Sequence, residues 1–283
     1  MNVPYNKAPN SSHICAEWYE RYFNTKPEGI GTAPEGSTDI YITTFGNKWF
    51  VEYQIETLRK FFLSPFNIII VDTNQNLHPE ISTHLLEICT REKVIYLKAP
   101  DNHYQEKQFF DSTMKLGSTL SFLFHNVVKF RKPRHFGFLD HDCFLFRPTT
   151  IHNLMRGKDI YGTVCRNIPK WNLHVITNFF EFKAVEHLPL DFRASYRHGL
   201  DTGGANYDIL YAGRNMEDYV LSHIGVRYME EDISLKDRVQ HYEVIDNRWM
   251  HMCASTHDLL AGDPGGEKKM LYTKGFLDAV LRV

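Results

Sequence analysis

The sequence is poor in cysteine and lacks a long apolar run. Its 283 residues include five scattered cysteines, and no two of them stand in C-x-x-C spacing. An odd, dispersed set argues against a disulfide framework and a zinc ribbon, and it fits a reducing compartment. The N-terminal region has no apolar signal-peptide core, and the apolar run 66–71 is far too short to cross a bilayer. We therefore expect a soluble, cytoplasmic protein without a transmembrane segment.

An excess of charge of either sign is also absent. Lys and Arg total 32 against 34 Asp and Glu, a formal net charge of -2, so no basic surface is expected to attract nucleic acid. An H-E-x-x-H motif and dense His/Asp clusters are missing too, which disfavours a metal-dependent hydrolase. With 43% hydrophobic and 23% charged residues, the composition is that of a globular protein with a full core. An anionic ligand would have to be held by a local site.

The first half of the sequence does contain a regular alternation of strand and helix patterns. Residues 1–37 are expected to form an irregular N-terminal extension, with one possible helix at 16–23. Strands are predicted at 39–45, 66–73 and 93–99, and helices at 48–62 and 79–91. A long helix at 111–130 then leads to a strand at 136–140. This order predicts an α/β fold with a doubly wound, mostly parallel central sheet flanked by helices.

The alternation weakens after residue 146. Short strands at 159–165 and 177–182 and a helix at 204–212 are expected there. We interpret 38–283 as a single domain with two halves, 38–146 and 147–283. Ligands of open α/β sheets bind beyond the carboxyl ends of the strands, so the first half is expected to bind a nucleotide.

Two carboxylates follow the strand at 136–140. Asp140 and Asp142 stand two residues apart, between apolar residues that would otherwise continue a buried strand. Burying such a pair without a partner would be costly, and a divalent cation bridging to phosphate oxygens would neutralise both charges. The alternative is a solvated pair or a helix cap in a loop. The apolar neighbours Phe138, Leu139 and Phe144 favour the metal site.

With its D-x-D motif, Asp140-His141-Asp142, after an upstream βαβ pattern, the sequence resembles the glycosyltransferases of the GT-A fold over roughly residues 39–256. The resemblance implies a Rossmann-like catalytic domain in which 38–146 binds a nucleotide-diphosphate sugar and 147–283 binds the acceptor. It also implies Mn²⁺ or Mg²⁺ as cofactor, a UDP- or GDP-sugar donor, and a carbohydrate or glycolipid acceptor, as in polysaccharide biosynthesis. A Q-x-x-R-W signature is missing, so we expect a single transfer.

The resemblance assigns donor contacts to several positions. They are Thr43, Thr44 and Phe45 at the end of the first strand, Asp72 after the second, Lys115 on the helix before the D-x-D strand, and Asp140 and His141. Asp72 can equally be a turn-forming residue after its strand. The third metal ligand, beside Asp140 and Asp142, would be His251, with His257 as the alternative; an isolated His among Trp and Met can also be a hydrogen-bonded core residue.

The acceptor side is implied by Leu200-Asp201-Thr202-Gly203-Gly204, which resembles the glycine-containing acceptor loop of these enzymes. Gly203 and Gly204 would allow close approach of the acceptor, although Asp201 or Thr202 could instead cap the following helix. Candidates for the catalytic base are Asp201 and Asp218, with Asp232 behind them. Glu217-Asp218 could also be a solvated first helical turn. Whether the transfer inverts or retains the anomeric configuration stays open.

Two other classes compete with the glycosyltransferase. A sugar-phosphate nucleotidyltransferase shares the layered sheet and a metal-bound phosphate, but it usually opens with a Gly-rich basic loop, and here the first strand is followed by one glycine, Gly46. A non-catalytic protein that retained the fold would have no need of the buried carboxylate pair.

Overall fold

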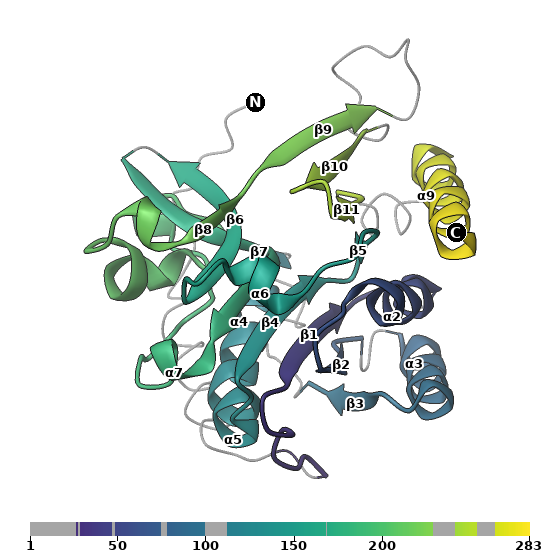
Figure 1. Ribbon diagram of the computed structural model, residues 1–283, viewed down its shortest axis with the longest axis horizontal. Coiled ribbons are helices and arrows are strands. Elements are labelled where there is room, and N and C mark those ends of the chain that lie inside the picture. The colour runs from purple at the N-terminus through teal and green to yellow at the C-terminus, as the bar shows by residue number, and fades with distance from the viewer. Residues whose placement is uncertain are drawn as a thin grey trace.

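The computed structural model describes residues 27, 29–46, 49–74, 78–99, 112–167, 169–228, 241–253 and 264–283. In this part of the chain a seven-stranded sheet adjoins a four-stranded sheet, and helices pack around them (Figure 1). The possible helix at 16–23 lies outside the described residues. None of the described helices is long and apolar enough to cross a membrane.

The larger sheet has the strand order β3-β2-β1-β4-β7-β6-β8. Its strands are β1 (Thr38–Thr44), β2 (Phe66–Asp72), β3 (Ile95–Lys98), β4 (His135–Asp140), β6 (Ile160–Asn167), β7 (Lys170–Glu181) and β8 (Val220–Ser222). Neighbours pair in parallel except at β7, which runs antiparallel to β4 and β6. The sheet is mixed but mostly parallel, so the predicted α/β fold is confirmed.

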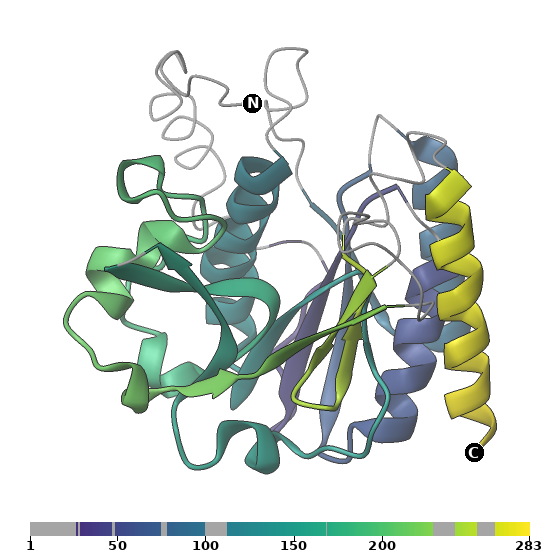
Figure 2. The ribbon, with the colours of Figure 1, turned by 90° about the horizontal axis from the view of Figure 1, so that it is seen from above.

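Helices cover both faces of this sheet (Figure 2). α2 (Trp49–Phe61) and α3 (Pro79–Glu92) pack on one face, where Ile40 and Ile42 of β1 point. The other face receives Tyr41 and packs against one long helix, made of α4 (Ser112–Phe122), a π-helical segment η2 (Leu123–Val128) and α5 (Lys129–Arg131). Adjacent β1 residues face opposite cores because side chains alternate along a strand. Coverage of both faces also explains why residues 68–71 of β2 are apolar without alternation.

The smaller sheet is antiparallel and was not predicted from the sequence. It consists of β5 (Cys143–Leu145), β11 (Trp249–His251), β10 (His241–Ile245) and β9 (Ile224–Tyr228), in that order. β10 and β11 form a hairpin whose turn residues Asp246 and Asn247 both have positive φ, as tight hairpin turns require. The strands of this sheet are only three to five residues long. Patterns this short are hard to recognise without their partners.

A C-terminal helix, α9 (Pro264–Arg282), was also not predicted. It lies beside α2 on the outside of the molecule (Figure 2). The hydroxyl of Tyr53 donates to Asp278 over 2.6 Å, and the ammonium of Lys60 donates to the carbonyls of Val280 and Leu281 at 3.2 and 2.7 Å. The carbonyls of a last helical turn lack intrahelical partners, so Lys60 caps the end of α9.

In the first half, predicted and observed bounds differ by at most two residues per end through β3. The later predictions need correction. The strand predicted at 177–182 is the end of the twelve-residue β7, and the helix predicted at 204–212 is a 3-10 turn, η4 (Gly204–Asn206), followed by a π-helical turn, η5 (Tyr207–Tyr211). In this segment the buried glycines and the closely packed loop take the place of a regular α-helix. The other short helical elements are α6 (Ile151–Met155), α7 (Phe182–Val185), η3 (Tyr196–His198) and η6 (Met216–Asp218).

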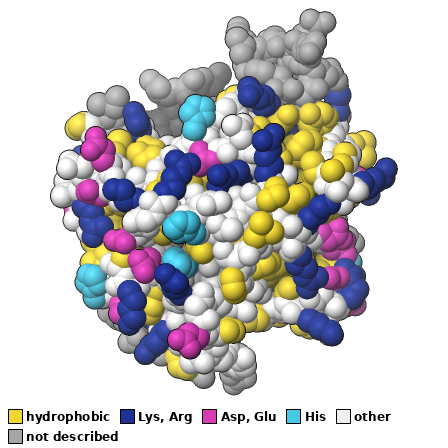
Figure 3. All heavy atoms as spheres, in the orientation of Figure 1, with side chains coloured by type: hydrophobic (Ala, Val, Ile, Leu, Met, Phe, Trp, Pro, Cys, Tyr) yellow, Lys and Arg dark blue, Asp and Glu magenta, His cyan; other side chains and the backbone are white. Residues whose placement is uncertain are grey.

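A buried ion pair ties the start of the sheet to the long helix. Arg131 donates to both carboxylate oxygens of Asp39, at 2.5 and 3.1 Å, and both side chains are almost fully buried. Tyr41 and Asn67 donate to the same carboxylate at 3.3 and 2.8 Å. Burial of the two charges is therefore matched by a bidentate pair and two further donors. On the face drawn in Figure 3, coloured Lys and Arg side chains are interspersed with Asp and Glu, in keeping with the net charge of -2.

Candidate functional site

The D-x-D residues lie at the corner where the two sheets meet. Asp140 is the last residue of β4, and Asp142 stands in the turn that leads into β5. β5 pairs with β11, where Cys143 is opposite His251, and the amide of Met252 donates to the carbonyl of Asp142 over 3.0 Å. This pairing brings His251 to the D-x-D turn, although the two are more than a hundred residues apart in the sequence. One ligand atom from each of Asp140, Asp142 and His251 lies within 4.8 Å of the others.

Gln54 holds the corner in place. Its amide, on a fully buried side chain of α2, donates to the carbonyls of Asp140 and Cys143 at 2.7 and 3.0 Å. These bonds satisfy backbone acceptors on both sides of the turn, where the strand ladder is interrupted. Gln54 was not among the predicted residues. A polar residue on the apolar face of α2 was the available signal.

The two carboxylates differ in their surroundings. The side chain of Asp142 is 5% exposed and that of Asp140 is 22% exposed, so Asp140 is the more open to a ligand. His141 lies against Asp140, with 3.1 Å between Nδ1 and Oδ1, and its ring packs near that of Phe50. Burial lowers the pKa of His141, but the carboxylates of Asp140 and Asp142 outweigh that effect and raise it. The turn thus concentrates negative charge that a cation, protonic or metallic, must balance.

His251 bridges two carboxylates. Its Nε2 lies 3.3 Å from Oδ1 of Asp142 and its Nδ1 lies 2.8 Å from Oε2 of Glu243. Burial opposes a charge on the ring, but these neighbours raise the pKa of His251 well above its ordinary value. For Glu243, burial alone would raise the pKa, yet the contacts with His251 and the nearby His174 lower it. Glu243 was not predicted, because nothing in the sequence marks it as the partner of His251 before the hairpin register is known.

The predicted acceptor loop packs tightly on β7. Gly203 has φ +90° and its amide donates to the carbonyl of Phe192 over 2.6 Å, while a Cβ there would lie 2.8 Å from the carbonyl oxygen of Leu173. At Gly204 a Cβ would lie 2.4 Å from Cβ of Leu200. Both glycines are therefore required by backbone packing. Contact with an acceptor stays a prediction.

Asp201 stands beside a histidine that was not predicted. Oδ1 of Asp201 accepts a hydrogen bond from the amide of Thr202 over 2.7 Å, and Oδ2 lies 3.7 Å from Nε2 of His174. The side chains of Asp201 and His174 are 45% and 27% exposed. His174 lies at the β-bulge between β6 and β7, where the register shifts after Gly162. Bulges redirect side chains near functional sites, and here the bulge brings His174 beside Asp201.

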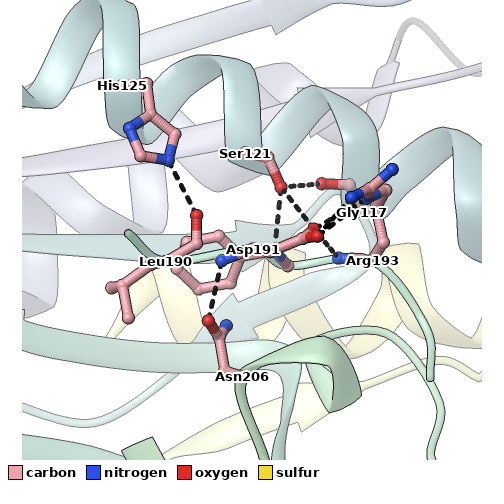
Figure 4. Close-up of polar contacts among 8 residues, drawn as sticks. Gly117, Ser121, His125, Leu190, Asp191, Arg193 and Asn206 are labelled. Carbon is pink, nitrogen blue, oxygen red and sulfur yellow. Dashed lines mark hydrogen bonds and ion pairs between the residues drawn. The ribbon is translucent and has the colours of Figure 1, made fainter. Parts of the chain in front are cut away.

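The segment before the loop is fastened to the long helix (Figure 4). Ser121 accepts a hydrogen bond from the amide of Phe192 over 2.8 Å and donates to the carbonyl of Gly117 at 2.8 Å. Asp191 binds the guanidinium of Arg193 through both carboxylate oxygens, and its own amide donates to Asn206 over 2.7 Å. A Cβ on Gly117 would lie 2.5 Å from Cα of Arg193.

Further contacts in Figure 4 extend this anchoring. Nε2 of His125 lies 2.8 Å from the carbonyl oxygen of Leu190 and donates to it. The loop that carries Asp201 is therefore positioned by α4 and η2.

The predicted donor residues gather at the same edge of the sheet as Asp140. In the register of β1, Thr43 pairs with Val71 on one side and Asp140 on the other, and Thr44 pairs with Asp72. The hydroxyl of Thr44 donates to the carbonyl of Val71 over 3.2 Å, so this side chain is engaged within the sheet. Beyond β1, the ammonium of Lys115 lies 4.3 Å from the centroid of the Phe45 ring.

Two predicted residues have structural roles in this geometry. Asp72 is fully buried, and its carboxylate accepts hydrogen bonds from the amide and side chain of Asn74 at 2.8 and 2.9 Å and from Tyr96 at 2.7 Å. Asp218 is exposed and closes a capping box with Asn215 around the single turn η6. These contacts favour the turn interpretation of Asp72 and the solvated first-turn interpretation of Asp218. His257 and Asp232 lie outside the described residues.

Comparison with known proteins identifies no family. No protein-family model matches the chain, and no curated protein sequence matches it. Among solved structures, a mannosyltransferase from Pyrobaculum calidifontis, determined in complex with GDP-Man and Mn²⁺, is similar over 62% of this chain at 12% identity and a TM-score of 0.34. The match spans 54% of that enzyme, about half its length. At this distance the likeness supports no conclusion, so function has to be argued from the site.

Proposed function

We propose that the protein is a metal-dependent glycosyltransferase of the GT-A fold that moves a sugar from a nucleotide-diphosphate donor to an acceptor hydroxyl. The observation that carries the proposal is the meeting of Asp140, Asp142 and His251 at the carboxyl edge of β1 and β4. Two carboxylates and one imidazole fit Mn²⁺ or Mg²⁺, which prefer oxygen ligands and keep positions open for phosphate. The same edge of an open α/β sheet is where ligands bind.

Each residue of the cluster has its own part. The buried Asp142 and His251 would hold the cation together with Asp140, which is the more exposed of the two carboxylates and so the more accessible to a donor. The bound cation would neutralise charge that develops on the departing diphosphate. Gln54 keeps the backbone of the turn in position through its two hydrogen bonds. His141, hydrogen bonded to Asp140, orients that carboxylate.

In this proposal the donor nucleotide binds at the end of β1. Phe45 offers an aromatic face beside Lys115, whose positive charge is 4.3 Å from the ring centroid. An aromatic ring next to an ammonium suits a nucleobase with its attached phosphates, by stacking and by charge. Thr43 stands two residues before Phe45 and pairs in register with Asp140 of the cation site. A UDP- or GDP-sugar is the expected donor.

Asp201 is the proposed catalytic base, in preference to Asp218. A base has to receive the proton of the acceptor hydroxyl, so it must be accessible and close to the donor site. Asp201 is 45% exposed and lies beside His174, whose charge is near enough to lower the pKa of Glu243, the partner of His251. Asp218 is occupied in its capping box. The loop of Gly203 and Gly204 would then form the floor for a carbohydrate or glycolipid acceptor.

Thermal unfolding with UDP, GDP, CMP and dTDP, each with and without Mn²⁺, tests the proposal. A ligand that binds only the folded state at 100 times its Kd stabilises it by about 2.7 kcal/mol. We expect one nucleotide to raise the midpoint only when Mn²⁺ is present, and Asp142→Asn to abolish that rise and sugar transfer. Asp208→Asn, at an exposed surface pair, is the matched control and should behave as wild type. If no nucleotide stabilises the wild type with Mn²⁺, the proposal is wrong.

A further inference from the structure

The β10–β11 hairpin places Glu243 directly opposite His251. The two residues form a register pair, followed by Val244 with Met250 and Ile245 with Trp249 next to the turn. Directly opposed residues on an antiparallel pair share one face of the sheet. A slip of one residue would move Glu243 to the other face, and the positive φ angles of Asp246 and Asn247 define the turn that prevents it.

The contact between the two side chains is short and buried. Nδ1 of His251 lies 2.8 Å from Oε2 of Glu243, with side-chain exposures of 10% and 21%. The other ring nitrogen, Nε2, lies 3.3 Å from Asp142. Because the two nitrogens sit on opposite sides of the ring, a carboxylate that accepts the Nδ1 proton leaves the Nε2 lone pair directed at the D-x-D turn.

We propose that Glu243 is the positioning residue of the metal site: it accepts a hydrogen bond from Nδ1 of His251 and thereby presents Nε2 to the cation. This inference depends on the metal site of the proposed function. Histidines that bind metals commonly donate their second N–H to a carboxylate, which selects the tautomer, orients the ring and makes the ligating nitrogen more basic. Glu243 does this without contacting the cation.

Cys253 provides the competing arrangement. Its Sγ lies 3.5 Å from Nδ1 of His251, and Glu243, His251 and Cys253 together could hold a metal ion through Nδ1. In that arrangement the thiolate is a ligand and the metal is a soft one such as Zn²⁺. The shorter contact from Nδ1 goes to Glu243, and a thiol is the weaker hydrogen-bonding group. Loss of Cys253 would weaken metal binding in the competing arrangement and leave it unchanged in the proposed one.

Mn²⁺ binding, measured by the electron paramagnetic resonance signal of the free ion, tests the role of Glu243 without relying on activity. We expect Glu243→Ala to weaken Mn²⁺ binding by about 10- to 100-fold, the usual effect of losing such a partner. Glu243→Gln keeps an acceptor oxygen of the same reach and should recover part of the affinity. Cys253→Ala is the matched control, since it removes the other group near Nδ1, and it should bind Mn²⁺ as wild type does.

Unfolding curves without metal show whether each variant is folded, and Glu243→Gln keeps the test decisive if the alanine variant does not fold. The protein loaded with Co²⁺ should lack a thiolate charge-transfer band. Unchanged Mn²⁺ affinity in both Glu243 variants, or equal losses in Glu243→Ala and Cys253→Ala, would overturn the inference. If wild type binds Mn²⁺ and Asp142→Asn does not, these results reject only the role of Glu243. If wild type itself fails to bind Mn²⁺ with a nucleoside diphosphate, the proposed function fails as well.

Discussion

Gly117→Ala should disturb the predicted acceptor loop from a distance. Gly117 lies on α4, against the backbone of the segment that leads to the loop (Figure 4). A Cβ there would lie 2.5 Å from both Cα of Arg193 and the carbonyl oxygen of Phe192. Ordinary contact begins at 3.4 Å, so helix and segment must separate by 3.4 − 2.5 = 0.9 Å. Both opposing atoms belong to the backbone, so a rotamer change cannot relieve the overlap.

The displacement has a cost in stability and a larger one in turnover. Overpacking of this kind costs about 1–3 kcal/mol, offset by about 1 kcal/mol for alanine over glycine within a helix. The carbonyl of Phe192 accepts from the amide of Gly203 over 2.6 Å, so the shift is passed on to the loop that carries Asp201. A misplacement of about 1 Å can reduce turnover by up to about 100-fold. Mn²⁺ affinity should stay unchanged, because Asp140, Asp142 and His251 lie on other elements.

Gly275→Ala is the matched control. Gly275 is also a helical glycine, in α9, but its Cβ would meet nothing within 4 Å. We expect this variant to be equally or more stable than wild type and fully active. The assays are urea unfolding, Mn²⁺ titration and transfer of sugar from the donor found in the nucleotide screen. If Gly117→Ala matched Gly275→Ala in both stability and turnover, the argument that α4 positions the loop would be refuted.

Three further predictions concern the base and two buried groups. Asp201→Asn should lower the rate of sugar transfer by about 10²- to 10⁴-fold while Mn²⁺-dependent nucleotide binding persists. Wild-type turnover in this variant would exclude Asp201 as the base and leave Asp218 as the next candidate. Burial lowers the pKa of His125 from 6.5 to about 4, so as the pH falls the unfolded chain binds a proton before the folded protein does. The contribution of the neutral His125 to the free energy of unfolding is therefore fully present above about pH 6.5 and falls by up to ~3 kcal/mol toward pH 4. His125→Gln should flatten that decline in urea unfolding measured between pH 7 and 4.5, and an identical decline would contradict the assignment. Arg131→Met leaves Asp39 buried without its cation and should cost about 3–5 kcal/mol, with part recovered in the Asp39→Asn double variant; a loss below about 1 kcal/mol would contradict this stabilising role of the ion pair.

The first half of the fold was predictable because each element carries its own signal. The helix 79–91 begins at Pro79, and its observed bounds, Pro79–Glu92, follow from that start. The strand at Phe66–Asp72 contains the unbroken apolar run 68–71 because both faces are covered by helices. The second half lacks such signals. Its small sheet is built from short strands that are stable only when paired, and the 204–212 segment takes its 3-10 and π-helical form from the loop packed around Gly203 and Gly204.

The amino-acid sequence by itself determined the position of Asp140 and Asp142, since a carboxylate pair at the end of an apolar strand is a local pattern. The resemblance of the sequence to a family also pointed to His251 as the third ligand, with His257 as the alternative. Only the tertiary structure brought His251 to the D-x-D turn, through the pairing of β11 with β5. Glu243, Gln54 and His174 entered the site in the same way. Their roles depend on strand register and on which helix face meets which turn, and these are set by contacts between residues far apart in the chain.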